Sequence, residues 1–378
     1  MGKMYRVSKN CNLVNVASSI LLRYGMHAEH EGIPELVEKM KPYSKIVFLL
    51  FDGMGKSLLE KHLTPDSFLR QHIFMSIDSV FPPTTVAATD ALLSGKYPCE
   101  NLWLGWSQYF SEIDKHLDVF SNRDTWTKEL SPYPDPMKKI AAYQTIFAQI
   151  KEKHPELDVA EIFPSFRPGG AETLEEWFMM VHKHLDNHDQ ALLYGYWTSP
   201  DHEAHDFGVD SVQVKVCIEK INDMLEQFTK QHPDTAFFVL ADHSLVDVEF
   251  LLIDEHPDFF ATLIRPFSIE PRAATFFVKP EKKEEFEQLF HLYYGKWFEL
   301  YRKEEVQNLK LFGYGEEHPL FSSFLGDYLA VSIDRYCFDY HAPELKGIGL
   351  GHDMIGAHAG GTKEEAQISL IFIKQKEE

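Results

Sequence analysis

The sequence predicts an α/β fold with a largely parallel central sheet and helices on both faces. Two observations lead to this prediction. Short, continuously apolar segments recur along the chain, and such segments are typical of strands that are buried on both faces of a sheet. Segments with helical spacing of apolar residues lie between them, and this alternation favours parallel strands joined by helices.

The first expected strand, KIVFLLF at residues 45–51, lies between Ser44 and the Asp52-Gly53 pair. The other expected strands are residues 73–80, 191–197, 235–241, 274–278, 328–333 and 369–373. The expected helices are residues 55–62, 86–94, 143–153, 174–185, 212–230 and 282–294. In such sheets ligands bind beyond the carboxyl ends of the strands, so the residues directly after each strand are the first functional candidates.

Two stretches interrupt the alternation of strands and helices. Residues 101–136 are rich in aromatic residues and end in SPYPDP, and residues 247–272 contain scattered Pro and His. We expect residues 1–378 to form a single α/β domain, with 101–136 and 247–272 as insertions or cap elements around a site. Length alone also allows two or three domain-sized units.

Composition narrows the class of protein. The 37 Lys+Arg and 58 Asp+Glu residues give a net charge of −21, which argues against binding nucleic acid or an anionic membrane surface. The hydrophobic fraction of 44% is sufficient for a large core. The four cysteines show no paired spacing, and no apolar run approaches the roughly 20 residues that span a bilayer. We therefore expect a cytoplasmic protein that does not bind membranes.

Acidic and imidazole side chains follow three of the expected strands, and one more His precedes the last strand on a Gly-rich segment. These candidate metal ligands are Asp52, Asp201, His205, Asp242, His243 and His358. Singly, each fits a turn, a solvated helix start or a loop equally well. Their joint occurrence at strand ends favours one shared site, with too many ligands for one tetrahedral zinc and enough for two divalent ions. Two such ions stabilise the attacking and leaving oxygens of a displacement at phosphorus.

A candidate nucleophile follows the strand at residues 73–80. Thr84 and Thr85 stand at the expected start of the helix at 86–94, directly after Pro82-Pro83. A helix-capping role explains Thr at this place, because Thr is a favoured N-cap. A helix N-terminus also attracts anions, and a hydroxyl close to a divalent ion loses its proton more easily. The capping and catalytic interpretations are compatible.

The order of these motifs resembles the alkaline phosphatase superfamily, and most of all its nucleotide pyrophosphatase/type I phosphodiesterase branch. The motifs are Asp-Gly after the first strand, the segment FPPTTVAATDALLSGKYPCEN, DxxxH, Asp-His and a late His-x-Gly-Gly. The resemblance implies that Thr85, rather than Thr84, is the nucleophile. It assigns one metal to Asp201, His205 and His358 and the other metal to Asp52, Asp242 and His243. Zinc is the ion implied at both positions, with manganese as the alternative.

The sequence departs from the secreted members of that branch after the Tyr-Pro segment. An Asn that contacts phosphate in those relatives is missing, and Trp106 falls near its place. No Arg adjoins the nucleophile, which favours a diester over a monoester because a diester phosphate carries one charge fewer. Neighbouring aromatic residues form either a substrate wall or the core of the insertion. They are Trp103, Trp106, Tyr109 and Phe110.

These observations predict a binuclear metal-dependent phosphohydrolase. Within that class we expect a phosphodiesterase that acts on a small phosphate ester through a covalent phospho-threonine intermediate. A phosphomutase or phosphomonoesterase of the same superfamily is the enzymatic alternative. A metal-stabilised binding protein without turnover is the non-enzymatic alternative. The sequence leaves the physiological substrate and the oligomeric state open.

Overall fold

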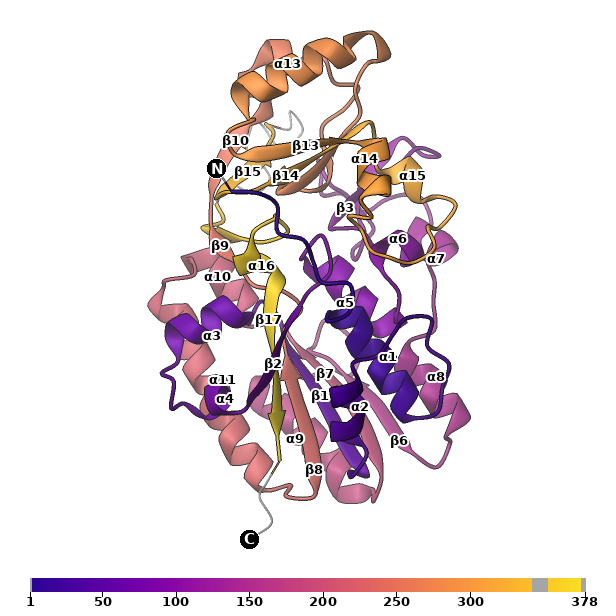
Figure 1. The fold of residues 1–378 in the computed structure, drawn as a ribbon, viewed down its shortest axis with the longest axis vertical. Coiled ribbons are helices and arrows are strands. Elements are labelled where there is room, and N and C mark those ends of the chain that lie inside the picture. The colour runs from indigo at the N-terminus through magenta and orange to yellow at the C-terminus, as the bar shows by residue number, and fades with distance from the viewer. Residues whose placement is uncertain (1, 342–352, 375–378) are drawn as a thin grey trace.

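Two β-sheets form the framework of the molecule (Figure 1). The computed structural model describes residues 2–341 and 353–374. The first sheet has six strands in the order β2 (Ile73–Asp78), β17 (Gln367–Ile373), β8 (Thr235–Leu240), β1 (Lys45–Phe51), β7 (Ala191–Trp197) and β6 (Asp158–Ile162). Strand β1 pairs in parallel with β7 and β8, and β6 with β7, whereas β17 is antiparallel to both of its neighbours. The prediction of a largely parallel central sheet is confirmed.

Helices cover both faces of this sheet, as predicted (Figure 1). Helices α1, α5 and α8 contact one another on one side, while α3, α4 and α10 contact α11 on the other. The helices are α1 (Leu13–Arg23), α2 (Pro34–Met40), α3 (Lys56–His62), α4 (Phe68–Gln71), α5 (Thr85–Ser94), α6 (Pro98–Asn101), α7 (Pro136–Ile140), α8 (Ile146–Lys153), α9 (Leu174–Asn187), α10 (Asp201–Phe207), α11 (Val212–Lys230), α12 (Pro257–Phe260), α13 (Lys283–Tyr293), α14 (Lys303–Asn308), α15 (Phe321–Phe324) and α16 (Lys363–Ala366). None of the helices described here is long and apolar enough to cross a membrane.

Local sequence explains several of the helix ends. The hydroxyls of Thr173 and Ser211 accept hydrogen bonds from backbone N–H groups in the first turns of α9 and α11, which is the usual N-cap arrangement. Helix α5 ends at Gly95, whose φ of 70° is accessible to glycine at little cost. Helix α5 therefore begins at Thr85 and ends before Gly95.

The second sheet is antiparallel and lies beyond one end of the first (Figure 1). Its seven strands follow the order β13 (Phe298–Arg302), β14 (Tyr328–Ser332), β12 (Ala273–Phe276), β11 (Ser268–Glu270), β3 (Ser107–Phe110), β4 (Lys115–Asp118) and β5 (Arg123–Asp124). Residues 274–278 and 328–333 were expected in the parallel sheet, and that placement is wrong. Apolar runs such as these indicate that a strand is buried on both faces. A buried strand of an antiparallel sheet shows the same pattern, so the pattern does not distinguish the two sheets.

Both stretches that interrupt the strand–helix alternation contribute to this second sheet. Residues 101–136 supply β3, β4 and β5, and residues 247–272 supply β11. The latter stretch also holds η1 (Ile253–Glu255), α12 and β10 (Glu249–Leu252), which pairs with β15 (Tyr336–Asp339). Two short pieces, β9 (Val246–Asp247) and β16 (Gly356–Ala357), pair beside them, and η2 (Pro280–Lys282) precedes α13. The division of the chain into one domain with two insertions stays a prediction.

A buried ion pair joins the second sheet to the C-terminal part of the chain. Arg272, in the turn between β11 and β12, donates from Nε and Nη2 to the two carboxylate oxygens of Glu365 at 2.7 and 2.8 Å. Both side chains are fully buried. Glu365 also accepts hydrogen bonds from the Gly360 backbone N–H and the Thr362 hydroxyl. The pair therefore fixes the segment between β16 and β17 against the second sheet.

We expect Arg272→Met to lower the free energy of unfolding by about 3–5 kcal/mol, because it leaves a buried carboxylate without its cation. Urea unfolding measures this loss. The double variant Arg272→Met/Glu365→Met removes both charges and should be more stable than the single variant. A single variant within about 1 kcal/mol of wild type would contradict this role.

Candidate active site

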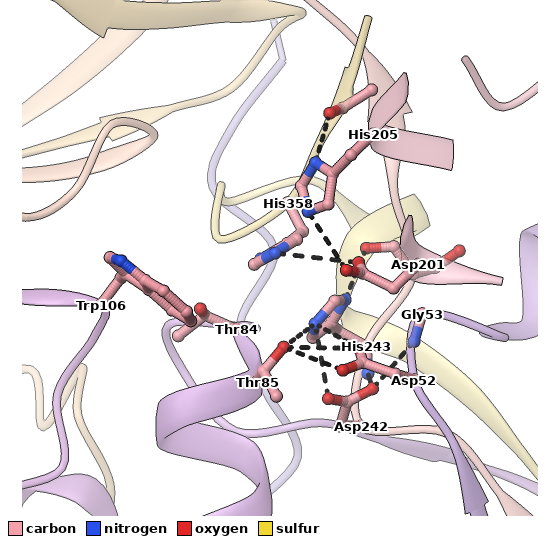
Figure 2. Close-up of polar contacts among 12 residues, drawn as sticks. Asp52, Gly53, Thr84, Thr85, Trp106, Asp201, His205, Asp242, His243 and His358 are labelled. Carbon is pink, nitrogen blue, oxygen red and sulfur yellow. Dashed lines mark hydrogen bonds and ion pairs between the residues drawn. The ribbon is translucent and has the colours of Figure 1, made fainter. Parts of the chain in front are cut away.

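The predicted ligand residues meet at the carboxyl edge of the six-stranded sheet, on the side that faces the second sheet (Figure 2). Asp52 directly follows β1, and the Asp242-His243 pair follows β8. Asp201 is the first residue of α10, and His205 lies on the same helix. His358 directly follows β16. The structure thus brings all six residues into one cluster, and their role as ligands stays a prediction.

The two threonines before and at the start of α5 face different partners. The Thr85 hydroxyl lies 3.1 Å from His243 Nε2 and 3.4 Å from each carboxylate oxygen of Asp52 (Figure 2). Thr84 is the N-cap residue, but its hydroxyl makes no cap hydrogen bond and instead donates to Glu270 at 2.7 Å. Of the two threonines, only Thr85 therefore presents its hydroxyl to the cluster.

A hydrogen bond from Tyr196 and close backbone packing at Gly53 hold Asp52 in place. Its carboxylate accepts a hydrogen bond from the hydroxyl of Tyr196, near the end of β7. Gly53, with a φ of 70°, donates its backbone N–H to Asp242 Oδ1 at 3.0 Å. A Cβ at position 53 would lie 2.9 Å from the Cα and Cβ of Asp201, so only glycine allows β1 and α10 to approach this closely.

Hydrogen bonds and ring contacts orient the imidazoles. His205 Nδ1 lies 2.7 Å from the Gly356 carbonyl oxygen and donates to it, which leaves Nε2 free to face Asp201 at 3.2 Å. The rings of His243 and His358 stack with centroids 3.9 Å apart. The backbone N–H of Ala359 donates to the Pro83 carbonyl, which holds His358 close to the start of α5.

Ligand atoms in the cluster form two overlapping groups, each within 4.8 Å. One group is Asp52, Asp242 and His243, and the other is Asp201, His243 and His358. His243 belongs to both groups, and His205 approaches the second group through Asp201. The assignment of His205 rather than His243 to the second metal stays a prediction.

The chemistry of this cluster fits divalent cations. Within the described residues, three buried ligand atoms have no hydrogen-bond partner: Asp201 Oδ1, Asp242 Oδ2 and His358 Nδ1. Buried polar atoms are normally hydrogen-bonded, so carboxylate oxygens that face only imidazole nitrogens, at 3.5 and 3.9 Å, fit a site for a divalent cation. Aspartate and histidine are ligands that zinc and manganese both accept.

Burial and the crowding of charge shift the pKa values of the cluster. Burial, together with the charges of Asp242 and Asp201, raises the pKa of Asp52 well above its usual value. Burial alone would lower the pKa of His205, but the Asp201 carboxylate overcomes it and raises the pKa to about 9. Burial and the neighbouring His243 lower the pKa of His358. Such divergent shifts in one cluster are typical of functional sites.

The family model for type I phosphodiesterase/nucleotide pyrophosphatase matches residues 46–309, which is more than half of the chain. The chain belongs to this family. It is accordingly a hydrolase acting on phosphate esters, which argues against the non-enzymatic alternative. None of the curated proteins matches the sequence significantly.

Solved structures of ectonucleotide pyrophosphatase/phosphodiesterase 5 share the fold of this phosphodiesterase-family chain. The murine protein has a TM-score of 0.60 at 15% identity, covering 86% of this chain and 87% of its own. An inactive murine Thr-to-Ala variant in complex with AMP gives 0.59 at 15%, with the same coverage. The human protein gives 0.61 at 14%, covering 87% of this chain and 88% of its own. The superfamily resemblance and the fold class are confirmed.

Glu270 is a candidate functional residue of this phosphodiesterase that the sequence did not reveal. It lies at the end of β11, is 5% exposed, and accepts hydrogen bonds at 2.7 Å from the Thr84 hydroxyl and the Trp106 backbone N–H. The preceding residue, Ile269, has a φ of 74°, which is strained for a β-branched residue and typical of functional sites. The segment SIEP carries no motif, so only the structure identifies this carboxyl group.

The aromatic residues after α6 divide between the two interpretations left open by the sequence. Tyr109 and Phe110 are buried in β3, as expected for the core of the insertion. Trp106 lies beside Thr84 (Figure 2) and is 45% exposed. Its ring meets that of the exposed Phe120 edge-on at 6.0 Å. Trp103 is partly buried and donates its indole N–H to the Ala141 carbonyl at 3.2 Å. Trp106 is therefore the most exposed member of this set and remains available to a substrate.

We expect Glu270→Ala to lower the free energy of unfolding by about 1–3 kcal/mol and to lower kcat, because the buried Thr84 hydroxyl and the partly buried Trp106 N–H lose their acceptor. Glu270→Gln keeps an acceptor oxygen and should restore most of both losses. Urea unfolding and steady-state kinetics measure these effects. An alanine variant with wild-type stability and kcat would contradict a positioning role for Glu270.

Burial raises the pKa of Glu270 to about 7, so the folded state favours its protonated form. Its contribution to stability is present below the pKa of the unfolded chain and is lost as the pH rises through about 7. The stability of Glu270→Gln relative to wild type should therefore increase between pH 5 and pH 8. Denaturation at several pH values tests this, and a constant difference would exclude it.

Proposed function

We propose that this protein is a binuclear metal-dependent phosphodiesterase in which Thr85 attacks the phosphorus of a small phosphate ester. One observation carries the proposal: the Thr85 hydroxyl, at the N-terminus of α5, lies 3.1 Å from His243 Nε2 and 3.4 Å from the Asp52 carboxylate oxygens. The inactive Thr-to-Ala variant of the murine relative supports a threonine in the chemistry.

In the proposed reaction, Thr85 Oγ1 forms a bond to phosphorus while the bond from phosphorus to the leaving alkoxy oxygen breaks. The proton of the Thr85 hydroxyl passes to solvent, and the leaving oxygen takes up a proton from solvent. A water molecule then attacks phosphorus and releases a proton to solvent. The bond from phosphorus to Oγ1 breaks and Oγ1 takes up a proton from solvent, which regenerates the Thr85 hydroxyl. The first backbone N–H groups of α5 stabilise the negative phosphoryl oxygens throughout.

Two divalent ions, when bound, supply Lewis-acid stabilisation of both oxygens and make the hydroxyl more acidic. In the arrangement that we propose, three ligands hold each ion: Asp201, His205 and His358 in one set, and Asp52, Asp242 and His243 in the other. Zinc is the proposed ion, with manganese as the alternative. The Gly356 carbonyl fixes the tautomer of His205, and the Tyr196 hydroxyl orients Asp52.

The preference for a diester is supported by the contacts of three arginines that could in principle reach a phosphate, Arg123, Arg167 and Arg265. Arg265 pairs with Asp114 at 2.7 Å, Arg123 bonds the Lys128 carbonyl, and Arg167 lies over the Phe163 ring. These contacts engage none of the three with the cluster around Thr85, whereas a monoester dianion is best bound by an arginine fork. The AMP bound to the murine relative makes nucleotide esters the first substrates to assay. The cytoplasmic location stays a prediction.

Replacing the nucleophile tests the proposal directly. We expect Thr85→Ala to reduce turnover of bis(p-nitrophenyl) phosphate at least about 10³-fold with unchanged metal content, because it removes the proposed nucleophile and the Thr84 hydroxyl is held by Glu270. Thr85→Ser should retain part of the activity.

Thr84→Ala is the matched control, since it removes a neighbouring hydroxyl that contacts Glu270, and it should retain most of the turnover. Full activity of Thr85→Ala combined with an inactive Thr84→Ala would assign the reaction to Thr84. Comparing rates on p-nitrophenyl phosphate separates diesterase from monoesterase activity.

Metal removal provides a second test. A chelator should abolish turnover of the diester, and added Zn²⁺ or Mn²⁺ should restore it, because the cluster contains too much buried negative charge to act without cations. We expect Asp201→Asn to lower bound metal by one equivalent in metal analysis. Asp206→Asn, which changes an exposed acid of the same helix, should bind as much metal as wild type. Full activity in the chelated protein would refute the metal-dependent mechanism.

A further inference from the structure

A second cluster of metal-ligating side chains lies at the opposite edge of the six-stranded sheet from Thr85. Asp158 is the first residue of β6, where the strand pairs with Ala191 at the start of β7. His184 lies in the last turn of α9, and His188 is the residue that caps this helix. The catalytic candidates follow the carboxyl ends of the strands, so this cluster is separated from them by the length of the sheet.

The three side chains converge on one point. His184 Nδ1 lies 2.7 Å from Asp158 Oδ2, and His188 Nδ1 lies 3.1 Å from the same oxygen. His188 Nδ1 also lies 3.0 Å from the backbone carbonyl oxygen of His184. One atom from each of the three side chains falls within a 4.8 Å group. The same nitrogen of each imidazole thus faces the same carboxylate oxygen.

We propose that Asp158, His184 and His188 bind a divalent transition-metal ion, with zinc as the preferred ion. Two imidazoles and a carboxylate are a common ligand set for zinc. Ligand atoms around a tetrahedral zinc lie roughly 3.3 Å apart, so the Asp158 oxygen needs to move away from the His184 nitrogen by about 0.6 Å and from the His188 nitrogen by about 0.2 Å. Both imidazoles then ligate through Nδ1 and carry their hydrogen on Nε2.

The surroundings favour entry of a cation. The side chains of His184, His188 and Asp158 are 32%, 46% and 12% exposed, so an ion reaches them from solvent and keeps room for a water ligand. The cluster stands at the C-terminus of a 14-residue helix, where carbonyl oxygens give a negative partial charge.

A nearby group, with two residues on α9, differs in how its imidazoles face the carboxylate. His182, Asp186 and His232 also lie within 4.8 Å of one another. However, His182 meets His232 through Nδ1 at 3.0 Å and Asp186 through Nε2 at 3.0 Å. Both nitrogens of the His182 ring are therefore engaged, each with a different partner, whereas His184 and His188 turn the same nitrogen to one carboxylate oxygen.

The bound ion would fasten the end of α9 to an edge strand. Strand β6 is the last strand of its sheet, with β7 as its neighbour. Binding that occurs only in the folded state stabilises it by mass action, so zinc should raise the thermal unfolding temperature through this site. This inference does not rest on the proposed reaction, because none of the three residues belongs to the cluster around Thr85.

Metal analysis of chelator-stripped, zinc-reconstituted full-length protein tests the site. We expect His184→Ala, His188→Ala and Asp158→Asn each to bind one zinc equivalent fewer than wild type, with unchanged turnover of a phosphodiester. His291→Asn, which changes an exposed histidine of α13, should bind the same amount as wild type. Zinc contents of all three variants equal to wild type, or an equal loss in His291→Asn, would overturn the proposal.

Protection of the wild-type protein provides a measurement that needs no variant. Diethyl pyrocarbonate modifies accessible imidazoles, and peptide mass spectrometry locates the modified residues. Zinc should slow modification of His184 and His188 several-fold while leaving His291 unchanged. Equal modification rates with and without zinc would overturn the proposal, whatever the metal requirement of catalysis.

Discussion

The buried pair between Arg272 and Glu365 is the interaction on which the arrangement of the site depends. It connects a turn of the second sheet to the segment that follows His358, and it leaves neither charge exposed. Glu365 also holds the Gly360 backbone N–H, two residues after His358. A buried charge pair tolerates few alternative geometries because each partner is costly to leave alone. The catalytic edge of the first sheet and the cap formed by the second therefore keep one relative position.

The same turn of the second sheet carries a second buried acid toward the site. Glu270 stands two residues before Arg272, so the tip of one hairpin supplies both the ion pair and the acceptor for Thr84 and Trp106. The unfavourable backbone conformation of Ile269 is tolerated because its neighbours are fixed on both sides. The second sheet thus contacts Thr84, the residue before α5, and also faces the cluster (Figure 1).

The sequence predicted the parts of this molecule that depend on local pattern. Continuous apolar runs identified the strands of the first sheet, and residues directly after them, such as Asp52 and Asp242, could be predicted because parallel strands end at one edge. The placement of residues 274–278 and 328–333 failed because burial does not reveal strand direction. Glu270 could not be predicted, since its importance arises from contacts with residues more than 150 positions away along the chain.

The contrast between Thr84 and Thr85 follows from the geometry of a helix start. Thr84 has an extended backbone, with φ of −140° and ψ of 149°, whereas Thr85 is the first helical residue. This change in backbone conformation sends the two hydroxyls in different directions, toward Glu270 and toward His243. Because the Thr84 hydroxyl donates to Glu270 of the second sheet, it does not accept a hydrogen bond from the first N–H groups of α5. Those N–H groups then remain available to an anionic phosphoryl group beside Thr85.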